Sequence, residues 1–317
     1  MDFRTIIPVA FASQQYNLSH HFLTMGSCFA EHIGNFLFNY KFQTITNPFG
    51  TIFNPLSVCK LLTQKNINPH RFVCRDEIWH HLDFHSSFWA TSRENLFQKI
   101  QQTFDKVRLE QIDVLIFTLG TAWVYEWKSD NQTVANCHKL PSDNFRKRLL
   151  EVDEIVQGIQ NLLNQYPHLH IILTVSPVRH LKDTLLGNAV SKSVLRLACH
   201  FLSRYERIFY FPAYEILLDD LRDYRFYEPD MIHPTAQAVE YICQHFSQCF
   251  LDESAQTWIK KWKAILQQLH HQPFYSQSKP YKSFLENLLS TLQQIKETDV
   301  SQEISQVQKI LESFSYS

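Results

Sequence analysis

Over the first 250 residues, short runs of apolar residues alternate with stretches in which apolar residues recur every three or four positions. Parallel strands that are buried on both faces read as continuous apolar runs, whereas spacings of three and four are typical of amphipathic helices. The alternation therefore predicts an α/β domain with a parallel sheet. Strands are expected at 22–25, 114–119, 171–175 and 207–211, and helices from residue 29 onward and around 56–64, 92–104, 151–165 and 189–204.

The pattern changes in the last part of the chain, which is rich in Gln and Lys and shows no convincing strand. Trp258, Trp262 and Leu266 recur there at helical spacing, which is typical of helices that bury one face. We therefore expect an α/β domain over residues 1–250 and a helical C-terminal extension over residues 251–317 that packs on it. A helical arm that binds a partner is the alternative.

Composition narrows the classes of partner. The chain has 30 basic and 31 acidic residues, so no excess charge attracts nucleic acid or an anionic membrane surface. The 7 cysteines are scattered without a CxxC pair, which argues against structural zinc and a disulfide framework. No apolar run is long enough to span a membrane, and residues 1–10 do not resemble a secretory signal. We expect a cytoplasmic protein that needs no cofactor, and its oligomeric state stays open.

A small-residue segment, Gly26-Ser27-Cys28, lies between the first predicted strand and the first predicted helix. Ligands of open α/β sheets bind at the carboxyl ends of the strands. A helix start offers free N–H groups and a positive dipole end, which predicts a lowered pKa and a reactive thiolate for Cys28. Ser27 is either the helix cap or the nucleophile itself. The alternative is a buried Cys28 beside a purely capping Ser27.

Late in the chain, Asp230 stands three residues before His233. A carboxylate at this spacing can hold the ring nitrogen that faces away from a nucleophile, and it stabilises the imidazolium formed when the histidine takes a proton. The pattern is weak by itself, because the chain contains 16 histidines. A helix-capping Asp230 beside a surface His233 is the alternative.

A third candidate position is Gly120-Thr121, at the end of the predicted strand 114–119. A glycine at a strand end lets the backbone approach a ligand closely, and the N–H groups that follow can point into a cleft. A plain strand-ending turn is the alternative.

The segment Gly26-Ser27-Cys28-Phe29-Ala30 spells the motif after which the GSCFA family is named, and the chain resembles that family over residues 20–250. The family in turn resembles a branch of the SGNH/GDSL esterase group. Further matching segments, besides Asp230 to Pro234, are Asn47-Pro48-Phe49-Gly50, Asn54-Pro55, Asn136-Cys137-His138-Lys139, Ser176-Pro177-Val178, Ser191-Lys192-Ser193 and Tyr224-Arg225-Phe226-Tyr227.

The resemblance implies a three-layer α/β/α, flavodoxin-like fold with a five-stranded parallel sheet. It places the nucleophile at Cys28, with Ser27 where the esterases have an aspartate. It also makes His233 the base and Asp230 the residue that orients it. Gly50 takes the place of the glycine whose N–H contributes to the oxyanion hole.

The chain departs from the esterase pattern at the block that usually reads Gly-x-Asn-Asp. Here it reads Gly120-Thr121-Ala122-Trp123, so the oxyanion asparagine is replaced by Ala122. Losing one oxyanion donor typically lowers the rate by about 10²–10³-fold. Residues that could supply another donor are Thr121, Asn136, His138 and Lys139, of which the loop 136–139 is favoured.

A histidine-rich segment contains His80, His81 and His85. Their spacing does not match the helical pair of histidines that usually binds a metal ion, so no metal is predicted. We expect a half-buried strand and turn there, with His85 lining the cleft.

Together these features predict an acyl-ester hydrolase or O-acyltransferase with a triad of Cys28 (or Ser27), His233 and Asp230. The expected substrate is a small-molecule or carbohydrate ester, with carbohydrate-linked acyl groups considered first. A thiol nucleophile depends less on its base than a hydroxyl does, and it favours transfer through a thioester. The alternative, supported by Ala122, is a non-catalytic module on a degenerate hydrolase fold that binds carbohydrate or a partner.

Overall fold

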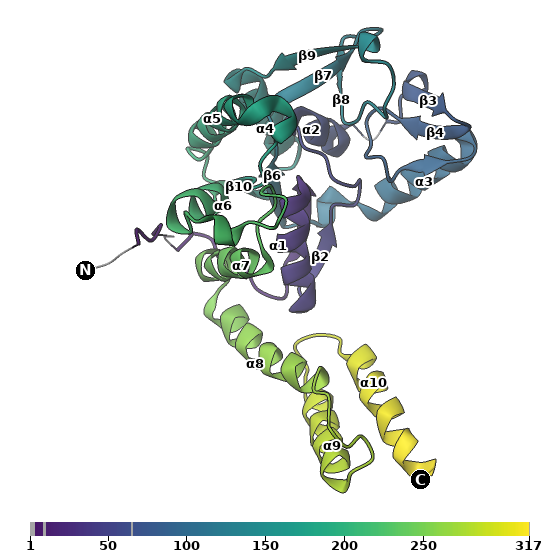
Figure 1. Ribbon diagram of the computed structural model, residues 1–317, viewed down its shortest axis with the longest axis vertical. Helices are drawn as coiled ribbons and strands as arrows, with labels where there is room; N and C mark the ends of the chain where they lie inside the picture. The colour runs from purple at the N-terminus through teal and green to yellow at the C-terminus, as the bar shows by residue number, and fades with distance from the viewer. Residues whose placement is uncertain (1–3, 9–10, 65, 317) are drawn as a thin grey trace.

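A five-stranded parallel sheet forms the centre of the computed structural model, which describes residues 4–8, 11–64 and 66–316 (Figure 1). Residues 1–3 and 9–10 lie outside the described residues. They belong to the segment 1–10, which was expected not to be a secretory signal. The spatial order is β11-β10-β6-β1-β2, which is the flavodoxin-like order of a doubly wound sheet. The predicted fold class is therefore confirmed. The strands are β1 (His21–Gly26), β2 (Gln43–Thr46), β6 (Val114–Leu119), β10 (His170–Val175) and β11 (Ile208–Tyr210).

The sheet separates two apolar cores because successive side chains of each strand point to opposite faces. Leu23, Leu115 and Ile171 contribute to the first core, whereas Phe22 and Val114 contribute to the second. Helices α2 (Pro55–Thr63), α3 (Arg93–Lys106), α4 (Val152–Gln165) and α5 (Thr184–Leu202) belong to the first core, and α1 (Cys28–Asn39), α6 (Ala213–Glu215) and α7 (Ala236–Phe250) to the second.

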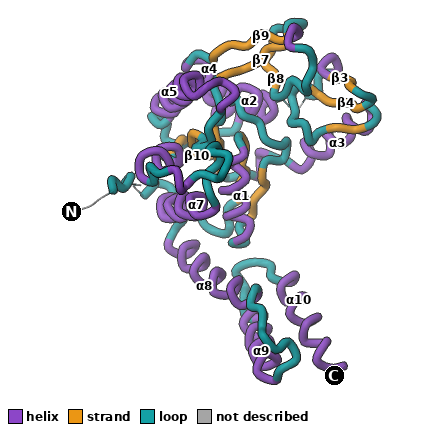
Figure 2. The backbone as a smooth tube through the Cα atoms, viewed as in Figure 1, coloured by secondary structure: helices purple, strands orange, loops and turns teal. Residues whose placement is uncertain are grey.

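The C-terminal part of the described chain consists of helices and loops, and it extends from the α/β body (Figures 1 and 2). Indole N–H groups tie it to the end of α1, since Trp258 donates to the carbonyl of Tyr40 at 2.8 Å and Trp262 to that of Asn39 at 2.9 Å. The division at residue 250 stays a prediction. The helices are α8 (Glu253–Leu269), α9 (Lys279–Gln293) and α10 (Ser301–Glu312).

No helix in the described part of the chain is both long and apolar enough to cross a bilayer.

Two small antiparallel sheets lie at the end of the molecule opposite to α8–α10 (Figure 2). A half-buried strand was expected around His80 to His85, and the strand at 78–81 agrees with it, whereas the other strands of these sheets were not predicted. Their strands are short, with polar, half-exposed positions, so none forms a continuous apolar run. The sheets consist of β3 (Phe72–Arg75), β4 (Ile78–His81) and β5 (Trp89–Ala90), and of β7 (Trp123–Trp127), β8 (Gln132–Val134) and β9 (Phe145–Leu149).

Candidate functional site

The candidate site lies at the carboxyl ends of β1 and β6, the neighbouring strands at which the sheet order reverses. Ligands of open α/β sheets bind at such switch points. Gly26 ends β1 with a φ of +126°, and a Cβ there would lie 2.0 Å from the carbonyl oxygen of Thr118. Only glycine allows this approach. The N–H of Gly26 donates to Oδ1 of Asn47 at 3.0 Å, which holds the turn in place. We call residues 26–28 the elbow.

Ser27 caps α1. Its Oγ accepts a hydrogen bond from the N–H of Phe29 at 3.3 Å, and its own N–H donates to the carbonyl of Thr118 at 3.0 Å. The residue is fully buried. Of its two predicted roles, the structure therefore supports the cap, and burial argues against a nucleophilic Ser27.

Cys28 is the first residue of α1 and is partly exposed. Its N–H has no partner within the helix, as is general for first-turn residues. Burial raises the pKa of the thiol, and the nearby Glu31 carboxylate raises it further. The helix-start N–H groups and Lys192 lower the pKa by less. The expectation of a lowered pKa is therefore wrong, because desolvation outweighs the helix terminus.

Lys192 lies beside the elbow and is almost completely buried. Its ammonium group donates to the carbonyl of Gly120 at 2.9 Å and to that of Ser176 at 2.7 Å. These carbonyls follow the neighbouring strands β6 and β10, so Lys192 ties two strand ends together. Burial lowers its pKa to about 7, while the charge of Cys28 acts in the opposite direction. Lys192 and Cys28 are therefore electrostatically linked.

Asp230 and His233 form the predicted pair. Oδ2 of Asp230 accepts from Nδ1 of His233 at 2.7 Å, while Oδ1 accepts from the backbone N–H groups of Ile232 and His233 at 2.8 and 3.0 Å. The ring contact, followed by these N–H groups, lowers the pKa of Asp230 to about 2. The carboxylate therefore stays ionised and leaves Nε2 of His233 as the free ring nitrogen. We call residues 230–233 the base turn.

His233 of the base turn lies near His32 in the second turn of α1. His233 and His32, four residues beyond Cys28, line the same cavity. Burial lowers the pKa of His32, and the charge of His233 lowers it further.

Three backbone groups that were expected to stabilise an oxyanion are already hydrogen-bonded. The N–H of Gly50 donates to the carbonyl of Asn47 at 2.8 Å, and those of Gly120 and Thr121 donate to the carbonyl of Phe53 at 2.9 and 3.0 Å. In this conformation they stabilise turns, so the predicted role of these N–H groups is corrected.

Position 122 offers no replacement donor. Ala122 is fully buried, and its N–H donates to Oγ of Ser191 at 2.7 Å. The hydroxyl of Thr121 lies 3.0 Å from the same Oγ. Ser191 therefore fixes the backbone after β6.

The other predicted site residues separate into two groups. Asn136 and Lys139 line a cavity together with Thr121, and their roles stay predictions. His138 is buried, stacks on His80 at 4.5 Å and has Nε2 at 2.9 Å from the carbonyl oxygen of His81, so it holds the small sheets together. That position does not suit the predicted contact with substrate.

His85 lies near Gly50 and Glu31. The His85 side chain packs against Gly50. A Cβ added to Gly50 would lie 2.5 Å from the Cβ of His85. Burial lowers the pKa of His85, and Glu31 partly opposes this effect. Within the described residues, no group of three potential metal ligands is found.

Two residues of the site were missed in the sequence. Lys192 shares its helix face with Leu195 and Cys199, which are buried, and this spacing could have marked it as buried. His180 follows the Ser176-Pro177-Val178 segment. Burial lowers its pKa to about 4, and the charges of Lys192 and His233 contribute to this shift. No local pattern distinguishes His180 from the other histidines.

The fold and this site define an α/β/α protein with a cysteine at the switch point of its sheet. The chain belongs to the GSCFA family, whose model matches residues 21–246, and the model of the GSCFA C-terminal domain matches residues 262–313. A search among curated proteins found no match.

Among solved structures, the chain is similar to a carbohydrate esterase family 3 protein from Talaromyces cellulolyticus. The TM-score is 0.35 and the identity 8%, with 77% of this chain and 99% of that chain covered. It is also similar to a family two carbohydrate esterase from Clostridium thermocellum, solved in complex with cellohexaose. The TM-score is 0.34 and the identity 12%, with 74% and 64% covered.

Proposed function

We propose that this protein is an ester hydrolase or O-acyltransferase in which Cys28 is the nucleophile, His233 the base and Asp230 the residue that orients His233. The observation that carries the proposal is the partly exposed thiol at the switch point, with His233 beside His32, four residues further along α1. Lys192 supports it, because a buried cation stabilises the thiolate that burial and Glu31 disfavour.

The chemistry follows from these positions. Nε2 of His233 takes the thiol proton, and the thiolate attacks the ester carbonyl carbon. The tetrahedral intermediate collapses to a thioester on Cys28, and the leaving alkoxide takes the proton from His233. Water, or an acceptor hydroxyl, then gives its proton to His233 and attacks the thioester. The products are the free acid, or the new ester, and the regenerated thiol.

A carbohydrate-linked O-acyl group is the substrate class to test first, because the GSCFA family resembles a group of esterases. Asp230 holds the His233 ring ready for this reaction, and the ion pair stabilises the imidazolium when it forms. The N–H of Cys28 is one oxyanion donor, since it has no partner within α1.

The test uses 4-nitrophenyl acetate and acetyl-CoA as donors, with the wild type and the variants Cys28→Ala, His233→Ala and Ser27→Ala. We expect turnover, a mass increase of one acetyl group on the peptide that contains Cys28, and loss of both in Cys28→Ala. Ser27→Ala removes a cap, which lowers stability by about 1 kcal/mol but leaves the adduct on Cys28. Turnover that persists in Cys28→Ala contradicts the proposed nucleophile. No turnover with any donor favours the binding module instead.

A further inference from the structure

A cavity of about 780 Å³ lies between the end of β6, the small sheet β8-β7-β9 and the loop after β10. Its volume is within the range of about 300–1,000 Å³ that is usual for small-molecule sites. Phe53 and Thr121 line it next to Gly120, while Trp123 and Tyr125 of β7 and the amide of Asn136 also line it. Apolar surface is thus combined with a few polar groups, as a sugar ring requires.

The charge of this cavity is one-sided. Its described lining contains Lys139, Lys147 and Lys182, but Asp183 is its one carboxylate. Asp183 pairs with Lys147, so two positive charges are left without a carboxylate in the cavity. Lys182 lies 5.7 Å from the ring centroid of Tyr125. The aromatic face orients this ammonium group, which stays available to an anion. We call the site the lysine-lined cavity.

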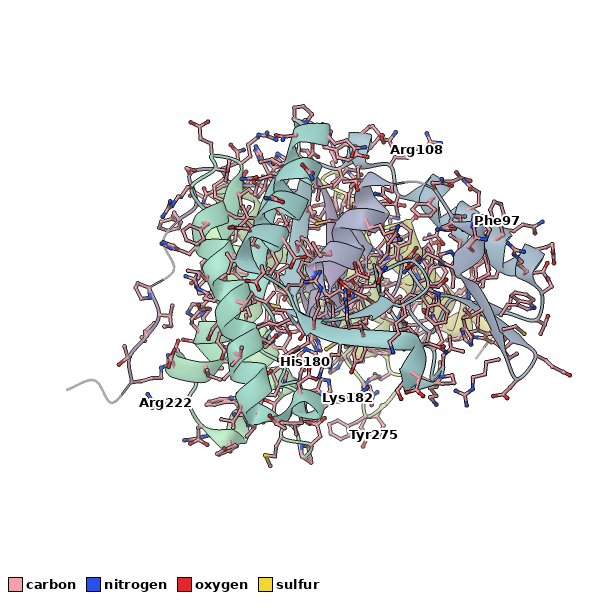
Figure 3. All side chains as sticks on the ribbon, turned by 90° about the horizontal axis from the view of Figure 1, so that it is seen from above. Phe97, Arg108, His180, Lys182, Arg222 and Tyr275 are labelled. Carbon is pink, nitrogen blue, oxygen red and sulfur yellow. The ribbon has the colours of Figure 1, made fainter. Side chains whose placement is uncertain are left out.

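His180 connects the lysine-lined cavity to the proposed site. It lines the cavity, and its ring lies edge-on to Phe53 with the centroids 5.1 Å apart. The N–H of the preceding residue, Arg179, donates to the carbonyl of Ile232 in the base turn at 3.3 Å, and the charges of Lys192 and His233 lower the pKa of His180 after burial does. Figure 3 labels His180 and Lys182, which come from the loop after β10 and lie near each other.

Nε2 of His180 is buried and has no hydrogen bond of normal geometry within the described part of the chain, although the nearby Gly120 backbone acts on the ring and raises its pKa. Buried polar atoms nearly always have a partner in the protein, in water or in a ligand. A hydroxyl or acid group of a bound molecule would supply a hydrogen-bond partner for Nε2 of His180.

We infer that the lysine-lined cavity binds an anionic saccharide, a sugar that bears a carboxylate or a phosphate, with its ester directed past His180 toward Cys28. That the ligand is a saccharide with an ester rests on the proposed function. That the ligand carries a negative charge follows from the lysines of the cavity. Carboxylates and phosphates form strong, charge-assisted hydrogen bonds with ammonium groups, so one cavity suits both.

Calorimetric binding to the full-length protein tests this inference separately from turnover. The carboxylate probe is trigalacturonate, with its neutral methyl ester as the matched control, and the phosphate probe is glucose 6-phosphate, with glucose as its control. We expect at least one charged probe to bind about 10-fold or more tightly than its neutral counterpart. This preference should weaken as salt rises from 0.05 to 0.5 M, because salt screens the lysines (about 10 Å Debye length at 0.1 M).

The variant Lys139→Ala/Lys182→Ala should lose at least about 10-fold in affinity for the preferred charged probe. Both lysines are exposed, so the variant should fold. The control is Lys309→Ala, an exposed lysine of α10 far along the chain from both cavities, which should bind as the wild type does.

The possible outcomes separate this inference from the proposed function. Equal binding of charged and neutral probes, or no binding of either, overturns the inference even if Cys28-dependent ester cleavage is found. Unchanged binding in the double variant also overturns it. Lysine-dependent binding of a charged probe without any turnover supports the anion site and contradicts the ester chemistry.

Discussion

The elbow and the base turn, the two halves of the proposed site, are held in place by different means. In the elbow, Gly26 and Ser27 are buried and contact Thr118 of the neighbouring strand, and the adjacent Lys192 bonds to the ends of two strands. In the base turn, Asp230 and His233 are each 45% exposed at the side chain. The contacts of the Asp230 carboxylate lie within four residues of chain.

This difference predicts how each half responds to substitution. A buried group that contacts several strands cannot change without loss of packing or of buried hydrogen bonds, so changes in the elbow should lower stability. A locally bonded, exposed turn can lose a side-chain contact while the rest of the fold is unaffected. Changes in the base turn should therefore lower the rate of turnover and leave stability nearly unchanged.

The largest effect is expected for Asp230→Asn in the base turn. The amide can no longer hold the reactive tautomer of His233 or stabilise its imidazolium, so kcat for ester cleavage should fall on the order of 10³-fold. Steady-state kinetics with 4-nitrophenyl acetate measures this, and thermal unfolding should give the wild-type Tm. A large loss of stability with unchanged kcat would contradict a catalytic role for the base turn and show that Asp230 stabilises the fold.

Gly26→Ala should produce the largest loss of stability in the elbow. The new Cβ would lie 2.0 Å from the carbonyl oxygen of Thr118, at a φ of +126°. Strain and displacement of β6 should lower the free energy of unfolding by about 3 kcal/mol or more, measured by urea unfolding.

The matched control is Gly158→Ala within α4. There the nearest atom is the flexible Leu56 Cδ2, at 3.2 Å, and alanine is the better helix former, so the change should be within about 1 kcal/mol of zero. Similar losses in both variants would show that the elbow is not specially constrained.

Acid should destabilise the region around the elbow through His180. Its pKa falls from 6.5 to about 4 in the folded chain, so between these values the unfolded state binds a proton that the folded state does not. Stability should therefore decrease as the pH falls from 6.5 to 4, by about 2 kcal/mol for this residue. The difference in urea unfolding between pH 7 and 4.5 should be smaller in His180→Gln than in the wild type. In His270→Gln, an exposed control, this difference should equal that of the wild type. Equal pH dependence of both variants would contradict a buried, neutral His180.

Lys192→Met should change the reactivity of the thiol in the elbow. Because the ammonium group lowers the pKa of the Cys28 thiol, its loss should raise that pKa further. At pH 8, alkylation of Cys28 by iodoacetamide should then be several-fold slower, whereas the variant Lys309→Met, at an exposed position of α10, should match the wild type. Peptide mass spectrometry gives the rate, with the exposed Cys74 as an internal reference. An unchanged ratio of Cys28 to Cys74 alkylation would mean that Lys192 is only structural.

Local sequence was sufficient to predict the features that depend on residues close to one another in the chain. The apolar runs at 22–25, 114–119 and 171–175 predicted three parallel strands, because strands buried on both faces need apolar residues at every position. Likewise, the spacing of Asp230 and His233 was enough to predict their contact, since one turn of chain brings the carboxylate to the ring.

Only the tertiary structure decided the features that depend on distant residues. The pKa of Cys28 is raised because packing desolvates the thiol beside Glu31, an effect larger than that of the helix start on which the sequence-based expectation rested. The N–H groups of Gly50 and Gly120 were expected to face an oxyanion. They donate to carbonyls of the loop 47–53 in this structure. Lys192 became part of the site because α5 packs across the ends of β6 and β10. Spacing along the chain records which residues are neighbours in a helix or turn, but burial and charge contacts arise only when separate strands and helices assemble.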